Sequence, residues 1–139
     1  MRRIRVAVTL DNDGGVAFNK RRQSRDRNLI SDLCLKNDGY IYVNPYSAPL
    51  FADFEDRIRV VASPINDCPD GELAFIECEN LGEHVESISE LTVYLWNRDY
   101  PSDKKLGIDV TAAGFKMSAK YEFVGSSHEK ITKGIYKKQ

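Results

Sequence analysis

A cluster of cations between Asn19 and Arg27 is the most unusual chemical feature of the sequence. Five of the eight residues from position 20 to position 27 are lysine or arginine, and the segment leads into a predicted helix. Side-chain cations beside free helical N–H groups suit a phosphate or a carboxylate. Charge runs are often solvated loops, but arginines are unfavourable in a first helical turn. This placement favours an anion-binding role for Arg21, Arg22 and Arg25.

A second polar group, Asn44, Tyr46 and Ser47, follows a predicted strand. Asn44-Pro45 has the composition of a helix start, and the end of a strand is a common ligand site in α/β sheets. Ordinary capping also explains Asn44, so both interpretations remain open.

The two histidines give no catalytic prediction. His128 follows Ser126 and Ser127, but no acidic third member is evident, and the serines are better explained as caps. His84 has no evident partner, so the sequence predicts no catalytic residue.

The three cysteines, Cys34, Cys68 and Cys78, are odd in number and unrelated in spacing. A zinc site or a disulfide framework is therefore not expected, and no metal is predicted.

Composition indicates an ordinary globular protein. The chain has 139 residues, 42% of them hydrophobic, and a formal net charge of −1. That charge argues against a general polyanion binder, so nucleic acid is not the expected partner. No apolar run is long enough for a membrane span, and the basic start leads into a strand rather than a signal peptide. A cytoplasmic location is expected, and the oligomeric state is left open.

Alternating strand and helix patterns predict a single α/β domain over residues 1–139, with a mostly parallel sheet and an antiparallel edge. Strands are predicted at 4–10, 40–43, 58–62, 73–76, 91–96 and 114–123. Helices are predicted from an N-cap at Ser24 to a stop at Gly39, from Asn44 through Phe51, and around 81–88.

The C-terminal segment is ambiguous. Ser126 with Glu129 forms a capping box, and Ile131 with Ile135 have helical spacing, whereas Gly134 weakens a helix. Residues 126–136 are thus open to helix or strand.

The order of these elements resembles the dihydrofolate reductase family over nearly the whole chain, and implies its three-layer sandwich. Residues 11–15 resemble the family's mobile active-site loop, and Tyr42–Ser47 stand where it has a Gly-Arg-Lys-Thr phosphate turn. Asp26 matches its substrate-binding acid, which implies pairing with a ligand's flat N–H edge. Arg57 matches its carboxylate-binding arginine. The alternative for Asp26 is a surface ion pair with a neighbouring arginine.

The departures from the family concern its cofactor. Asn44–Ser47 lacks the phosphate-gripping arginine and threonine, and Glu77-Cys78 replaces a Gly-Gly turn where backbone approaches a pyrophosphate. No NADPH is therefore expected.

The chain also resembles short bacterial proteins that sometimes carry the transferred name ribonuclease Z. That activity needs a His-x-His-x-Asp-His metal cluster, which two histidines cannot build.

Together these features predict a non-reductase domain that binds a small anion, such as a nucleotide or pterin-like molecule. Two alternatives stay open. One is a divergent NADPH-dependent reductase, and the other is a protein- or RNA-interaction module that uses residues 20–27. The expected cleft is lined by the residues Phe18, Arg22, Asp26, Asn44, Tyr46 and Arg57.

Overall fold

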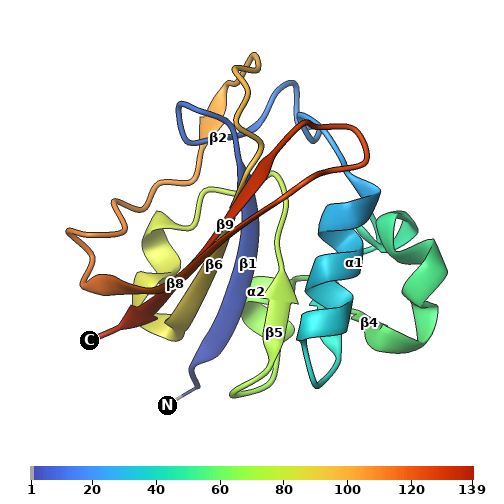
Figure 1. Cartoon of the computed structure of the whole chain (residues 1–139). Coiled ribbons are helices and arrows are strands. Elements are labelled where there is room, and N and C mark those ends of the chain that lie inside the picture. Colours follow the sequence, from blue (N-terminus) through green and yellow to red (C-terminus); the bar gives the residue numbers. More distant parts are fainter. Residues whose placement is uncertain (1) are drawn as a thin grey trace.

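A computed structural model describes residues 2–139 of the chain (Figure 1). Seven strands form the central sheet, in the order β4-β3-β5-β1-β6-β9-β8. Along the chain these strands are β1 (Ile4–Leu10), β3 (Ile41–Val43), β4 (Ile58–Val60), β5 (Leu73–Phe75), β6 (Ile88–Leu95), β8 (Phe115–Phe123) and β9 (Ile131–Lys138). Two short strands, β2 (Gly15–Ala17) and β7 (Lys104–Lys105), pair separately.

The sheet is parallel from β4 to β6 and antiparallel at the β9 and β8 edge. Alternating β1 side chains feed two cores, since Val6 and Val8 join one cluster and Ala7 joins the other. Helices α1 (Arg27–Lys36) and η1 (Ala48–Arg57) cover the Ala7 face. The short helices α2 (Pro64–Asp67) and η2 (Gly82–Ser87) lie on the other face. The predicted three-layer α/β sandwich is confirmed.

Helix α1 buries the four residues whose spacing predicts it: Leu29, Ile30, Leu33 and Cys34. Its N-cap is Asp26 and not Ser24, because Asp26 is extended and its carboxylate accepts from the N–H groups of Asn28 and Leu29. The C-cap is Asn37, two residues before the predicted stop, and its side chain donates to the Gly39 carbonyl.

The helix predicted to begin at Asn44 begins later. Asn44 accepts from the N–H of Ser47 through Oδ1 at 2.8 Å and so closes a turn, and η1 starts only at Ala48. A side chain that bonds nearby backbone competes with helix formation, which moves the start.

The ambiguous C-terminal segment contains a strand. Strand β9 lies between β6 and β8 and pairs with both, so its backbone groups are bonded on each side. A helix in this segment would lose the hydrogen bonds to both neighbouring strands. The alternative of a helix, based on the spacing of Ile131 and Ile135, is therefore wrong.

Candidate functional site

The candidate site lies at the carboxyl edge of the parallel strands. Asp11, Asn44, Glu77 and Trp96 each follow one of these strands by one or two residues. The loop between β8 and β9 reaches the N-terminal end of α1, near this edge (Figure 1).

Asp26 is buried and accepts five hydrogen bonds. Its Oδ1 accepts from the backbone N–H groups of Asn28, Leu29 and Ser126, at 2.9, 3.2 and 3.0 Å. Its Oδ2 accepts from the Ser127 N–H at 2.8 Å and lies 2.9 Å from Nδ1 of His128. These bonds fill the directions from which a ligand's N–H edge would approach. Asp26 is neither a surface ion pair nor a free cleft acid.

His128 is the hydrogen-bond partner of Asp26 that the sequence analysis did not predict. Its ring is buried, and its Nε2 lies 3.1 Å from Ser24 Oγ and 2.9 Å from the Tyr100 hydroxyl. Trp96 stacks on the ring with centroids 4.5 Å apart. The acid missing from the sequence argument is Asp26, which lies 102 residues from His128, so no local motif could have identified it.

Gly125 makes this arrangement sterically feasible. A Cβ at this position would collide with Oδ2 of Asp26 and would lie 2.9 Å from the His128 carbonyl. The loop from β8 can therefore pass over the carboxylate only as glycine.

Hydrogen bonding sets the ionisation of Asp26. Burial by itself would raise the pKa of this carboxyl, but bonds from Ser126, Ser127, His128 and Leu29 outweigh it and lower the pKa to about 2. Asp26 is thus a carboxylate near neutral pH, and it favours the tautomer of His128 that carries the proton on Nδ1.

We expect the Asp26 carboxylate to make the free energy of unfolding depend on pH. As pH falls, Asp26 is protonated near pH 3.8 in the unfolded chain but only near pH 2 in the folded protein. The stabilisation from its carboxylate is therefore complete above about pH 5 and is lost as pH falls towards 2. The shift corresponds to about 2 kcal/mol. Urea unfolding at pH 5 and pH 2.5, with NMR titration of the Asp26 carboxyl, measures it. An ordinary carboxyl titration near pH 4 would contradict the prediction.

A second cluster brings together Arg22, Tyr46 and Ser47 around Glu77. Arg22 donates to both oxygens of Glu77 at 2.9 and 3.0 Å, and Ser47 Oγ donates to Oε1 at 2.7 Å. The guanidinium also stacks on the Tyr46 ring at 4.3 Å. Glu77 is buried, so this acid neutralises Arg22 within the fold. Two of the predicted ligand contacts, Arg22 and Ser47, are thus bonded to an internal acid, and the third, Tyr46, packs against Arg22.

The backbone beside Glu77 keeps a conformation that glycine prefers. Cys78 has φ +63°, in the left-handed region that non-glycine residues rarely adopt. The turn therefore has a backbone shape suited to glycine, but it carries the side chains of Glu77 and Cys78. These side chains would prevent a pyrophosphate from approaching the backbone closely.

A pocket of about 260 Å³ lies beside the basic loop. It is lined by Phe18, Asn19, Arg21, Arg22, Gln23, Tyr100 and Pro101. Asn19 and Lys20 form the turn of a tight hairpin, both with positive φ, in which the backbones of Phe18 and Arg21 bond each other. The hairpin holds the Phe18 ring and the Arg21 guanidinium, both exposed, at the pocket.

The remaining predicted residues lie elsewhere. Arg25 lines a different groove with Asp26, and Arg57 lies at the opposite end of α1, where it donates to the Cys34 carbonyl. The prediction that one cleft is lined by all of these residues is therefore wrong. The N–H groups in the first turn of α1 are also occupied, by Ser126 and Asp26, so this helix start offers no free donors there.

Two general properties concern the described residues only. Within residues 2–139 no three His, Cys, Asp or Glu side chains are grouped so as to hold a metal ion. In the same part of the chain, no helix has the length and apolar character needed to cross a membrane.

Comparison with known proteins identifies the architecture. Dihydrofolate reductase from Enterococcus faecalis, solved with NADP(H) and RAB-propyl, superposes with a TM-score of 0.66. The match covers 97% of this chain and 95% of that one, at 10% sequence identity. The chain has the dihydrofolate reductase fold. No family model and no curated protein sequence matches it. At this identity the dihydrofolate reductase likeness concerns the fold alone, and function depends on the residues present.

Proposed function

We propose that the protein binds a small planar organic anion, of the nucleotide or pterin-like class, in the pocket beside the basic loop. Four of its lining residues supply complementary chemistry. Phe18 offers an aromatic face, Arg21 a cation, Tyr100 a hydroxyl and Gln23 an amide oxygen. The volume, about 260 Å³, suits one ring system with a short anionic group and not a dinucleotide.

The observation that carries this proposal is the side-chain oxygen of Gln23. Its amide nitrogen donates to Asp11 Oδ2 at 2.7 Å and to the Pro101 carbonyl at 3.2 Å, which determines the amide orientation. The oxygen is buried and has no hydrogen-bond partner among residues 2–139. A buried acceptor left unpaired is costly. A ligand with an N–H donor beside its anionic group would satisfy Gln23 and Arg21 together.

The cluster around Glu77 argues against a nicotinamide cofactor held in the manner of the dihydrofolate reductase family. Glu77 places a buried carboxylate at the turn that a pyrophosphate would approach, and it already binds Arg22 and Ser47. An anionic phosphate there would meet a like charge and would have to break those bonds. We therefore propose binding without reduction.

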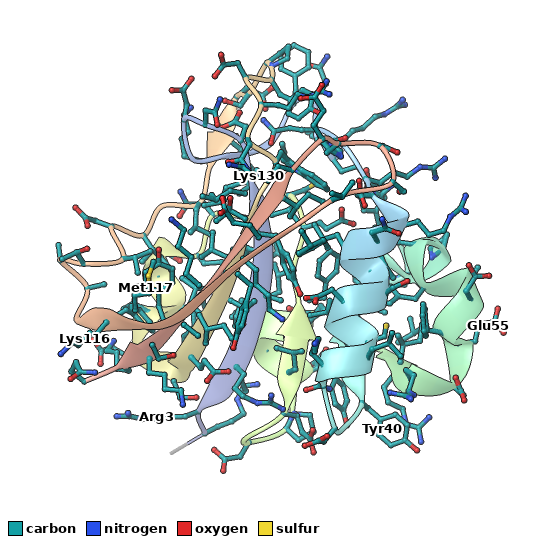
Figure 2. All side chains as sticks on the ribbon, in the orientation of Figure 1. Arg3, Tyr40, Glu55, Lys116, Met117 and Lys130 are labelled. Atoms are coloured by element: carbon teal, nitrogen blue, oxygen red, sulfur yellow. The ribbon has the colours of Figure 1, made fainter. Side chains whose placement is uncertain are left out.

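Thermal unfolding with nucleoside monophosphates and with pterin-6-carboxylate tests the proposal. A ligand at about 100 times its Kd should add about 2.7 kcal/mol to the free energy of unfolding. Arg21→Ala should weaken binding about 10-fold or more, because it removes a charge-assisted contact. Lys116→Ala is the matched control, since Lys116 is an exposed cation on β8 (Figure 2).

Folded protein that shows no shift with any of these compounds contradicts the proposal. Retention of an acidic protein or RNA through Arg21 and Arg25 in low salt, without small-molecule binding, would instead support an interaction module.

A further inference from the structure

We propose that Ser24 is the nucleophile of an acyl-transfer site, with His128 as its general base and Asp26 as the residue that positions His128. This activity goes beyond ligand binding by the basic loop and does not depend on it. The two proposals share only Tyr100, which lines the pocket and also contacts His128.

The three side chains have the connectivity that activates a serine. Asp26 Oδ2 lies 2.9 Å from Nδ1 of His128, and His128 Nε2 lies 3.1 Å from Ser24 Oγ. With the carboxylate accepting a hydrogen bond from Nδ1–H, the single lone pair of Nε2 faces the hydroxyls of Ser24 and Tyr100, and it acts as a base when Ser24 is the donor. A nucleophile, a base and a third group that orients the base recur on unrelated folds, and are recognised by this geometry.

The acid and the base of the cluster are buried, and the proposed nucleophile lies nearer to solvent, where an ester could reach it. Asp26 and His128 are buried, with side-chain exposures of 0% and 1%, whereas Ser24 and Tyr100 are only partly buried. The two hydroxyls therefore form the solvent side of the cluster. Trp96 stacks on the imidazole and limits its rotation.

The reaction is a double displacement on a carboxylic ester. Ser24 Oγ attacks the carbonyl carbon while its proton moves to Nε2 of His128. The C–O bond to the alcohol then breaks, and the imidazolium gives that proton to the leaving oxygen. Water, deprotonated by the same nitrogen, cleaves the acyl-serine and releases the acid and the free Ser24 hydroxyl.

Tyr100 is suited to stabilise the intermediate of that reaction. In the resting arrangement its hydroxyl lies 2.9 Å from the same Nε2 as Ser24 Oγ. When Nε2 takes the serine proton it can no longer accept from Tyr100. The phenol is then free to donate to the neighbouring oxyanion.

The enclosed space beside Ser24 is too small for an acyl chain. The cleft that Ser24 lines with Phe75 and Trp96 has a volume of only about 10 Å³. That is room for about one water molecule, so no acyl group fits inside this cleft. The ester must therefore meet Ser24 from the solvent side, where a small acyl group such as acetyl is the least obstructed.

Labelling with a small alkyl fluorophosphonate, followed by peptide mass spectrometry, tests the assignment. We expect one adduct, on Ser24, and hydrolysis of p-nitrophenyl acetate that falls at least about 100-fold in Ser24→Ala. The control is Ser118→Ala, which removes an exposed hydroxyl on β8. Tyr100→Phe should slow the hydrolysis and leave Ser24 labelled.

A cysteine variant provides a test that does not need a folded His128 mutant. Burial raises the pKa of the native thiols Cys34, Cys68 and Cys78 to about 11, so these react slowly. In Ser24→Cys, the added thiol should be alkylated by iodoacetamide at least about 10-fold faster than the thiol of Ser118→Cys, an exposed position on β8. Equal alkylation rates, or unchanged hydrolysis and labelling in Ser24→Ala, would overturn the proposal.

Discussion

Replacing Asp26 by asparagine is expected to destabilise the protein by about 3 kcal/mol. The amide oxygen can still accept at the position of Oδ1, but its NH₂ group would face the Ser127 N–H and Nδ1 of His128. Donors would then oppose donors in a buried site, which leaves groups unpaired and breaks a buried charged contact. Asp26→Ala should cost about 1 kcal/mol more, because the N-cap of α1 is lost as well.

Urea unfolding of Asp26→Asn beside Asp38→Asn gives the measurement. Asp38 is an exposed acid close to the other end of α1, so its variant should stay within about 0.5 kcal/mol of the parent. An acid reserved for a ligand is typically unfavourable to the fold, and its removal is neutral or stabilising. An unchanged or raised midpoint for Asp26→Asn would therefore show that the carboxylate is not a structural anchor.

Replacing Asp32 by leucine is expected to lower the free energy of unfolding by about 3–5 kcal/mol, because it leaves the buried ammonium group of Lys133 without a partner. Lys133 Nζ lies 2.8 Å from Asp32 Oδ2, and the buried Tyr94 hydroxyl donates to the same oxygen at 2.7 Å. The side chains of Lys133 and Asp32 are only 8% and 17% exposed. This contact joins α1 to β6 and β9, and so helps to hold the helix whose N-terminus carries Asp26.

The double variant Asp32→Leu/Lys133→Met separates charge from packing. Removing both charges should recover at least about 2 kcal/mol of the single-variant loss, since no unpaired ion remains. The Tyr94 hydroxyl still lacks its acceptor, which limits the recovery. Chemical denaturation of both single variants and the double variant gives the coupling free energy. Additive losses would mean that Lys133 and Asp32 are not energetically paired.

The two proposals make separable claims about one edge of the sheet. Ligand binding depends on Arg21 and Gln23, which lie on the basic loop, and acyl transfer depends on Ser24 and His128. Arg21→Ala should therefore weaken the ligand-induced stabilisation and leave labelling of Ser24 intact. Ser24→Ala should have the opposite pattern.

The local elements and their order can be predicted from the sequence. The apolar spacing of α1 and the short β-branched runs at β1, β3 and β5 are local periodicities, and each element formed close to where its pattern lies. The order of these elements was sufficient to indicate the dihydrofolate reductase fold at 10% identity to a solved example. Periodicity carries this information because it fixes which side chains share a face.

The partners of the functional side chains were decided by the tertiary structure alone. The sequence predicts Arg22 to be a ligand-binding cation, whereas in the structure it pairs with Glu77, 55 residues away. The sequence predicts Asp26 to be an acid for a ligand, whereas its partner is His128, 102 residues away on a segment whose local pattern also fits a helix. Pairing with β6 and β8 made that segment a strand and brought His128 over α1. Local propensity does not record such long-range pairing, because sheet register and burial, which depend on the whole fold, determine which side chains meet.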